Sequence, residues 1–256
     1  MPAKNAHGFY QTSRAHFRQL IFRTVLKRGP ISRQKISSLL HLRYVTLQGF
    51  VTELLNEKII KESGNVVVRR GRAPIFLTVN PDGGRVVGIA MTADEISAVL
   101  FGLDMVELQA VRQRTEPGAS AESLQRTIFD LIERLLHSPE GRGHKLWGIG
   151  FGEYGLYDTQ KGVTLRSTCY ENWHGVPIQK LLHEHFAVPV RVNSSERCEL
   201  LCERLWGAAR EARTAVFLDV QEGIGFAVLD KGELLSGASG FAGEIGHIQM
   251  VQDGEM

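Results

Sequence analysis

The spacing of apolar residues predicts three helices near the start of the chain. Apolar side chains recur every three or four positions in His16–Lys27, Arg33–Leu40 and Tyr44–Asn56, which is the helical period. Ser32 is a good N-cap for the second helix, and His41-Leu42-Arg43 leaves only a short turn before the third. Two short helices joined by so tight a turn are typical of a helix-turn-helix unit, whose second helix enters the major groove of DNA.

A β-hairpin is predicted directly after these helices. Ile59–Glu62, Val66–Val68 and Ile75–Val79 are short apolar runs typical of strands, and Ser63-Gly64-Asn65 is a turn sequence. The hairpin tip is Arg69-Arg70-Gly71-Arg72, and guanidinium groups in such a place can enter a minor groove or bind phosphates. Residues 14–80 are therefore expected to form a winged helix-turn-helix domain, preceded by a loose arm at residues 1–13.

Charge is distributed unevenly along the chain. Residues 1–80 carry 14 Lys and Arg against 3 Asp and Glu, a formal charge of +11, although the whole chain carries only +2. A basic segment that coincides with a helix-turn-helix pattern favours a nucleic-acid partner over a merely solvated surface.

The predicted interface with duplex DNA has two parts. Base reading is assigned to the third helix, and backbone or minor-groove contacts to the second helix and the hairpin tip, because Gln suits adenine and Arg suits guanine or phosphate. The predicted base-reading residues are Arg43, Tyr44, Gln48 and Thr52. The residues predicted to contact the DNA backbone or the minor groove are Arg33, Gln34, Arg69, Arg70 and Arg72. The alternative is a helical domain used for protein contacts. Gly49 lies inside the third helix and costs it about 1 kcal/mol relative to Ala; close approach to the first helix or to DNA would explain it, and the sequence leaves both open.

The rest of the chain alternates strands and helices, which predicts an α/β fold. A meander of strands precedes a helix over Ala121–Leu136 and a buried strand at Leu146–Phe151, and a second meander ends the chain. The other expected elements are strands at Val86–Met91, Ile96–Leu103, Val106–Arg112, Val188–Val192, Ala215–Val220, Ile224–Leu229 and Glu233–Leu235 and helices at Ile178–His185 and Glu196–Gly207. The repeated meander suggests two related lobes, and a cleft between lobes is the default ligand site.

The order of several motifs carries a family resemblance. GRAPIFLTVNPDGGRVVGIAM, WGIGFGEYGLYD, VPVRVNSSERCELLCERLWG and GFAGEIGH follow one another as in the ROK family (repressors, open reading frames and kinases), and ISRQKISSLLHLRYVTLQGFVTELLNEKIIKE is similar to the helix-turn-helix of its regulator branch. The resemblance covers residues 14–250. It implies a partial actin-like ATPase domain, ribonuclease H-like and sugar-kinase-like, with a first lobe at residues 81–194 and an incomplete second lobe at 195–256.

The kinase chemistry of that family is expected to be lost. The family's first phosphate turn, D-x-GGT, is replaced by Ala90–Asp94 without glycine, and its second, GTG-x-G, by Val220–Gly225 with Glu222 at the phosphate position. The family's catalytic aspartate follows the asparagine of a V-x-N-D run, whereas Ser194 follows Asn193 here, and serine cannot act as a carboxylate base. We therefore expect no catalytic residues, no cofactor and no enzyme activity.

Ligand binding is expected to survive that loss. The resemblance implies that Asn193, Glu244 and His247 face a sugar, and these side chains suit a polyol; the alternative is that they are retained only by descent. The resemblance also implies a zinc site in the family, formed by the histidine of GE-x-GH and by a cysteine run that would begin beyond Met256. We therefore expect no metal in this chain; Cys198 and Cys202 alone are a weak zinc signal. The sequence leaves open whether the chain is a fragment or a natural truncation.

Composition narrows the class of protein. No apolar run reaches the length of a membrane span, the first residues lack the apolar core of a signal peptide, and the chain has only three cysteines. The sequence thus predicts a cytoplasmic regulator, a repressor of carbohydrate-metabolism genes, which binds an operator in double-stranded DNA, a sugar or sugar-derivative effector and a second copy of itself, but no membrane. The alternatives are a ROK sugar kinase, or a regulator whose ROK domain is only a dimerisation scaffold.

Overall fold

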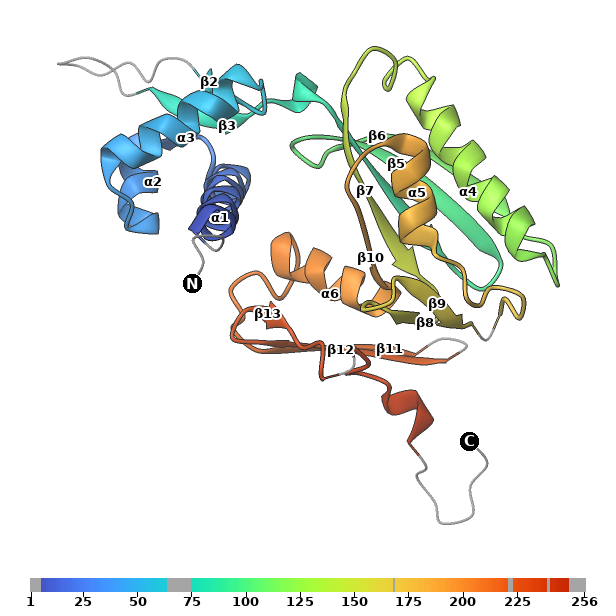
Figure 1. The fold of residues 1–256 in the computed structure, drawn as a ribbon. Helices are drawn as coiled ribbons and strands as arrows, with labels where there is room; N and C mark the ends of the chain where they lie inside the picture. Colours follow the sequence, from blue (N-terminus) through green and yellow to red (C-terminus); the bar gives the residue numbers. More distant parts are fainter. Residues whose placement is uncertain (1–5, 64–74, 168, 221–222, 239, 249–256) are drawn as a thin grey trace. The chain divides into compact units, whose positions relative to one another are not determined.

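The computed structural model describes the backbone of residues 6–63, 75–167, 169–220, 223–238 and 240–248, and their side chains except those of residues 6–13 and 247. The chain divides into two compact units (Figure 1). The first unit contains residues up to Arg85 together with the short segments Phe101–Val106 and Gly143–Lys145, and the second contains the remainder.

The first unit combines three helices with a small antiparallel sheet. The helices are α1 (Ala6–Arg28), α2 (Arg33–Leu40) and α3 (Tyr44–Asn56), the strands are β1 (Ile31–Ser32), β2 (Ile60–Ser63) and β3 (Phe76–Val79), in the order β1-β3-β2, and a short 3-10 helix, η1 (Pro81–Gly83), follows. All three helices contribute apolar side chains to the core. Its fully or almost fully buried members are Ile21, Val25, Ile36, Leu47, Val51, Leu54, Ile60 and Leu77.

The second and third helices occupy the predicted residues. The Ser32 hydroxyl caps α2 by accepting a hydrogen bond from the Lys35 amide at 3.3 Å, and His41 ends the helix in the left-handed conformation (φ 50°). The first helix begins at Ala6 instead of His16, so the backbone of residues 6–13 is helical where a loose arm was expected. No proline interrupts the chain between Pro2 and Pro30, so the helix can extend beyond its amphipathic part. The predicted strand Val66–Val68 and the arginine-rich tip lie outside the described residues.

A five-stranded sheet forms the centre of the second unit, in the order β10-β7-β4-β5-β6. Its strands are β4 (Arg85–Met91), β5 (Glu95–Gly102), β6 (Glu107–Arg114), β7 (Leu146–Glu153) and β10 (Val190–Ser194). Helices α4 (Ala121–Leu136) and α5 (Ile178–Phe186) lie side by side on one face (Figure 1), where Phe129 packs against the rings of His185 and Phe186. The predicted first meander and the α4 helix are confirmed, and the core fills with side chains such as Ile96, Ile128 and Trp173.

The carboxyl ends of two parallel strands position the site described below. β7 and β10 pair in parallel, with Asn193 opposite Gly152 and Ser194 opposite Glu153. The chain then enters α6 (Ser195–Leu205), which contacts β7 and β10 and also the strands that follow it.

The end of the second unit is a smaller sheet that packs on α6. It contains β11 (Ala215–Val220), β12 (Ile224–Asp230) and β13 (Glu233–Leu234) in sequential order, as the second predicted meander required. Leu200 of α6 is buried against Ala227 and Leu229. Three elements of this unit were not predicted, the two strands of a hairpin, β8 (Leu156–Asp158) and β9 (Val163–Arg166), and a 3-10 turn, η2 (Ile245–His247). In the first unit, β1 and η1 were not predicted either.

Among the described residues, no helix is both long enough and apolar enough to cross a bilayer.

Candidate functional site

The N-terminal unit presents one face of α3 to solvent. Leu47, Val51 and Leu54 bury the opposite face of this helix. Val45, Gly49 and Thr52 are spaced as i, i+4 and i+7 and form an exposed stripe, in which Val45 retains 84% of its accessible surface. This face of α3 is therefore accessible to a partner.

The predicted base-reading residues gather at the beginning and along the exposed side of this helix. Arg43 is the exposed N-cap residue and makes no side-chain capping bond. Tyr44 is 49% exposed, and its hydroxyl accepts a hydrogen bond from Gln48 Nε2 at 3.1 Å. Thr52 is exposed one turn further on. The structure therefore brings these four side chains to one accessible surface.

The predicted backbone-contacting residues are in different situations. Gln34 is exposed on α2. Arg33 is paired within the protein: its Nη2 lies 2.6 Å from Glu62 Oε1 on β2, and its side chain is only 15% exposed. An arginine held in this way is less available to a phosphate than the sequence suggested. Arg69, Arg70 and Arg72 lie outside the described residues.

Arginines also hold the two other acidic side chains of the first 80 residues. Glu53 accepts from Arg14 and from Arg18, and Glu57 accepts from Arg18 at 2.6 and 2.8 Å. The hydrogen bond from Arg18 lowers the pKa of the Glu57 carboxyl. These pairs connect α1 to the C-terminal half of α3, at a distance along the helix from Arg43 and Tyr44. The first turn of α3 itself contains no acidic residue.

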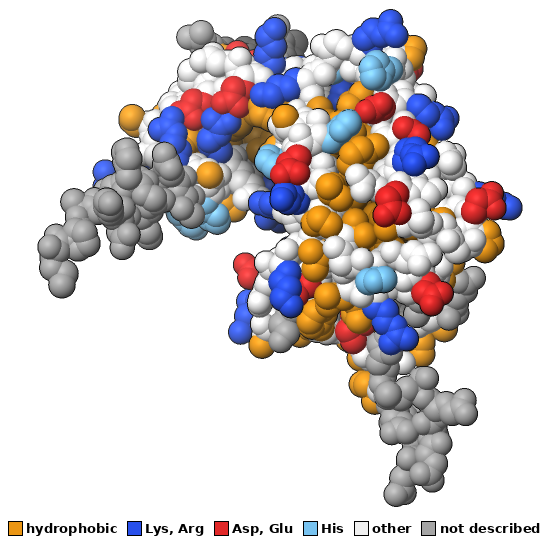
Figure 2. Space-filling model, turned by 45° about the vertical axis from the view of Figure 1, so that its right-hand side comes forward, with side chains coloured by type: hydrophobic (Ala, Val, Ile, Leu, Met, Phe, Trp, Pro, Cys, Tyr) orange, Lys and Arg blue, Asp and Glu red, His pale blue; other side chains and the backbone are white. Residues whose placement is uncertain are grey.

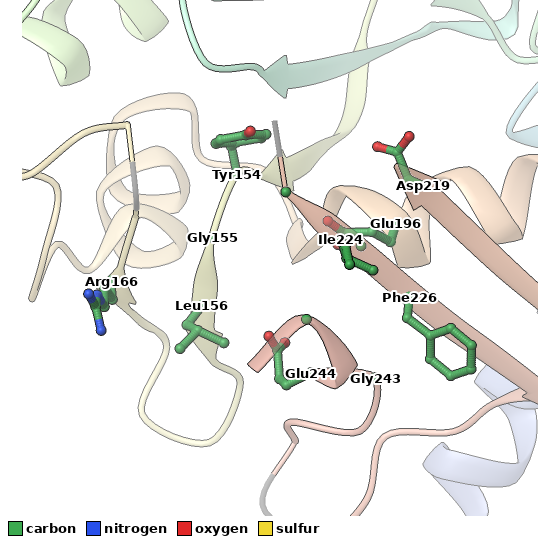
Figure 3. A pocket seen from close by; sticks show the side chains of 13 residues that line it. Tyr154, Gly155, Leu156, Arg166, Glu196, Asp219, Ile224, Phe226, Gly243 and Glu244 are labelled. Atoms are coloured by element: carbon green, nitrogen blue, oxygen red, sulfur yellow. The ribbon is translucent and has the colours of Figure 1, made fainter. Parts of the chain in front are cut away.

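The second unit contains an open cavity of about 220 Å³ (Figure 3). Its walls come from the β7–β8 connection, the start of α6, the β11–β12 turn and the loop before η2. The side chains around it are Tyr154, Leu156, Arg166, Glu196, Asp219, Ile224, Phe226 and Glu244, and the glycines are 155, 223, 225, 243 and 246. Apolar side chains beside carboxylates are a suitable lining for a hydroxylated small molecule.

Two of the three predicted sugar-facing residues meet beside this cavity. Asn193 and Glu244 line an adjoining slot, and Glu244 also lines the main cavity, into which its carboxylate points (Figure 3). Asn193 Oδ1 accepts a hydrogen bond from the Ser194 amide at 3.2 Å. The backbone of His247 forms the last residue of η2, next to Gly246 of the cavity wall, and its side chain is not among those described.

A carboxylate that sequence reasoning missed lies against the second glycine turn. A Cβ placed on Gly225 would approach Glu196 Cγ to 2.4 Å, so this glycine leaves room for the Glu196 side chain. Asp219 lines the same cavity. In the sequence Glu196 is visible only as the acidic residue after Asn193-Ser194-Ser195. Its place beside Gly225 depends on the packing of α6 on β12, which no local pattern predicts.

Arg197 was also missed, and it fastens the loop that leads to Glu244. Its side chain is buried, with 7% of its surface exposed. Nη2 donates to the carbonyls of Gly240 and Ala242 at 2.8 and 2.9 Å. The residue thus connects α6, which starts beside Asn193, to the GFAGE segment.

Glu153 is a buried acid at the end of β7, next to the cavity residue Tyr154. Its carboxylate accepts from Trp173 Nε1 at 2.9 and 3.1 Å, and its backbone carbonyl accepts from the Ser195 hydroxyl at 3.1 Å. Burial raises the pKa of Glu153 to about 7, although the indole hydrogen bond opposes the shift. No sequence pattern indicated this pair, because its partners are 20 residues apart.

The cysteines of the second unit are reduced. Burial raises the pKa of the Cys198 thiol to about 12, so it behaves as a small apolar side chain. Across the part of the chain that the structure describes, no three His, Cys, Asp or Glu residues cluster as metal ligands would. The prediction that this chain holds no metal remains a prediction.

A profile of the ROK family matches residues 86–256, which is the second unit almost in full. The chain belongs to the ROK family. The resemblance seen in the motifs is thereby confirmed, and the ROK domain begins where the small N-terminal unit ends.

Curated relatives of this ROK protein extend over both units. The chain is 30% identical over 228 residues to the xylose repressor of Caldicellulosiruptor bescii, covering 89% of this chain and 57% of the relative. It is 26% identical over 255 residues to the DNA-binding transcriptional repressor Mlc of Escherichia coli, covering 98% and 62%. The chain thus spans somewhat more than half the length of the relatives that it matches.

Solved structures support the fold. A crystal structure of a ROK transcriptional regulator, a homologue of E. coli Mlc, superposes with a TM-score of 0.79 at 21% identity over 94% of this chain and 61% of the other. A ROK glucokinase from Streptomyces griseus, solved with glucose and AMPPNP, matches 67% of this chain and 52% of its own with a TM-score of 0.59 at 22% identity. The α/β architecture with a kinase-like ROK domain is therefore established.

Proposed function

We propose that this ROK protein is a sequence-specific DNA-binding repressor of carbohydrate-metabolism genes. In this proposal the first unit is a winged helix-turn-helix domain, and the ROK domain binds a sugar or a sugar derivative without phosphorylating it. The observation that carries the proposal is the exposed, acid-free start of α3, with Arg43, Tyr44 and Gln48 on one surface. The names of the relatives, which match both units, point in the same direction.

The charge distribution supports a polyanionic partner. The basic excess of the chain lies in residues 1–80, and each acid there is paired with an arginine. On the face of the second unit in view in Figure 2, acidic and basic side chains are instead interspersed. Phosphate contacts would supply affinity, and base contacts from α3 would supply specificity.

The cavity is poorly suited to phosphoryl transfer. Catalysis of that reaction needs donors or cations around the transferred group and a carboxylate base at the sugar hydroxyl. Arg166 also lines the cavity, but Glu196 lies against the glycine turn, Asp219 lines the same cavity, and Ser194 occupies the position of the family's catalytic aspartate. Negative charge at the phosphate position would repel the substrate, so the proposal excludes a kinase.

The same cavity suits a neutral polyol. Asn193 and Glu244 can exchange hydrogen bonds with hydroxyl groups, and Leu156, Ile224 and Phe226 provide apolar contacts for a pyranose ring. Its walls come from both the β7–β8 region and the β11–β12 region, so a ligand there would affect their arrangement and in turn the affinity for DNA.

Self-association is part of the proposal, because helix-turn-helix proteins commonly bind two half-sites as dimers. Val216, Leu218 and Val220 expose between 55 and 67% of their surface on one side of β11. Such an apolar row would be covered by a second copy. Sedimentation equilibrium should detect a dimer that Leu218→Lys converts to a monomer; a monomer at all concentrations would contradict this part.

Two binding experiments test the function. The purified chain should enrich specific duplexes from a random library, and its affinity for them should change when a sugar from a panel of pentoses, hexoses and amino sugars is added. Duplex binding that no sugar alters, together with no heat in calorimetry, would instead favour the scaffold alternative. Turnover of ATP with any of these sugars would contradict the argument from Glu196 and Ser194.

A further inference from the structure

The exposed stripe on α3 contains Gly49, and neither backbone conformation nor close packing in the described structure requires a glycine there. Gly49 lies in the middle of a 13-residue helix, where glycine is less favourable than alanine. It adopts ordinary helical geometry and is not among the glycines with positive φ. Apart from its two chain neighbours and the nearby backbone of its own helix, no heavy atom of the described residues lies within 4 Å of the place where a Cβ would be. No described atom of α1 therefore approaches Gly49 closely enough to explain the residue.

The residues beside Gly49 on the stripe are small, and the acidic residue one turn further on, Glu53, is paired with Arg14 and Arg18. The neighbours of Gly49 on the stripe, Val45 and Thr52, have short β-branched side chains, and both are exposed. The longer side chains of Arg43, Tyr44 and Gln48 lie beside this stripe at the start of the helix. A helix shaped in this way can bring its backbone unusually close to a surface while longer side chains reach past it.

We propose that Gly49 is the point at which the backbone of α3 approaches the duplex most closely, so that the missing Cβ sets how deeply the helix enters the groove. The inference rests on the proposed function, because it requires the partner to be DNA. Duplex DNA is favoured as the occupant because the stripe belongs to the strongly basic segment of the chain. In this arrangement Val45 is positioned to contact a thymine methyl group, and Gly49 acts as a positioning residue for that contact.

The inference is tested by substitutions that favour the helix and block the approach. Gly49→Ala should raise the thermal midpoint of the first unit by about 4 °C, because alanine is the better helix former. The same variant should bind a duplex selected by the wild-type chain at least about tenfold more weakly, because the helix can no longer seat against the base edges. Gly49→Leu should reduce that affinity further while the helix stays formed. Gln19→Ala, at an exposed position of α1, is the matched control and should change neither property.

The readouts are circular dichroism for stability and fluorescence anisotropy for binding, both on the full 256-residue chain. Increased stability together with weakened specific binding supports the inference, since a damaged fold would lower both. If Gly49→Ala binds the selected duplex as tightly as the wild type does, the inference is wrong although the proposed function stands. If the wild type binds no duplex at all, the proposed function itself fails.

Discussion

The buried carboxyl of Glu153 makes the stability of the ROK domain depend on pH. Only 1% of this residue is exposed, and the rise of its pKa from 4.5 to about 7 is caused first by burial. A group whose pKa is raised by folding binds its proton more tightly in the folded state. Stability is therefore lost as pH rises from about 4.5 to about 7, and above that range the penalty reaches about 3 kcal/mol.

The perturbation is Glu153→Gln, which replaces the carboxyl by a neutral group of the same shape. The unmatched amide hydrogens carry a cost of their own, but that cost does not depend on pH. The stability of the variant relative to the wild type should therefore be higher by roughly 2 to 3 kcal/mol at about pH 8.5 than at about pH 5.

The assay is urea unfolding followed by tryptophan fluorescence, because Trp147, Trp173 and Trp206 all lie in the second unit. Glu171→Gln, at an exposed position of the same unit, is the matched control and should leave the pH dependence unchanged. If the variant and the wild type lose stability in parallel between the two pH values, the reasoning about burial is refuted.

Three further predictions concern other elements. Arg43→Ala should relax base preference, whereas Arg70→Ala should weaken binding to every duplex and reduce the dependence of affinity on salt. If both variants change the affinity for selected and random duplexes equally, the assignment of Arg43 to base reading is contradicted. Arg197→Met should lower the free energy of unfolding by about 2 kcal/mol and weaken sugar binding, because the carbonyls of Gly240 and Ala242 lose their donor. Sugar binding that is unchanged in calorimetry would show that the loop keeps its conformation without Arg197. Ser32→Ala should cost about 1 kcal/mol through loss of the α2 cap, measured by thermal unfolding, while Ser38→Ala at an exposed position should not.

Local signals predicted much of the fold. The bounds of α2, α3 and α4 follow from helical spacing, and that of α2 also from its cap, Ser32, which accepts a hydrogen bond from the next turn. The structure adds Ser120 as the cap of α4, which the sequence analysis did not name. The start of α1 at Ala6 was missed because its first turns lack an amphipathic pattern. The β8–β9 hairpin was missed because strands of three and four residues give too short a period to detect.

The site was predicted only where a family motif named its residues. Asn193 and Glu244 do line a common slot. Glu196 and Arg197 gain their roles from contacts with Gly225 and with the loop at Gly240, which are distant in the sequence. The pairing of Arg33 with Glu62 is equally non-local, and it makes this side chain less available for the backbone or minor-groove contact that its residue type suggested.

The measurement that tests the account most directly is the affinity of the full chain for duplex DNA as a function of salt. By fluorescence anisotropy, a duplex enriched from a random library should bind more tightly than a random duplex at every salt concentration. The logarithm of affinity should fall with the logarithm of salt by about 0.9 for each phosphate contacted. A chain that binds no duplex of any sequence at low ionic strength would contradict the account.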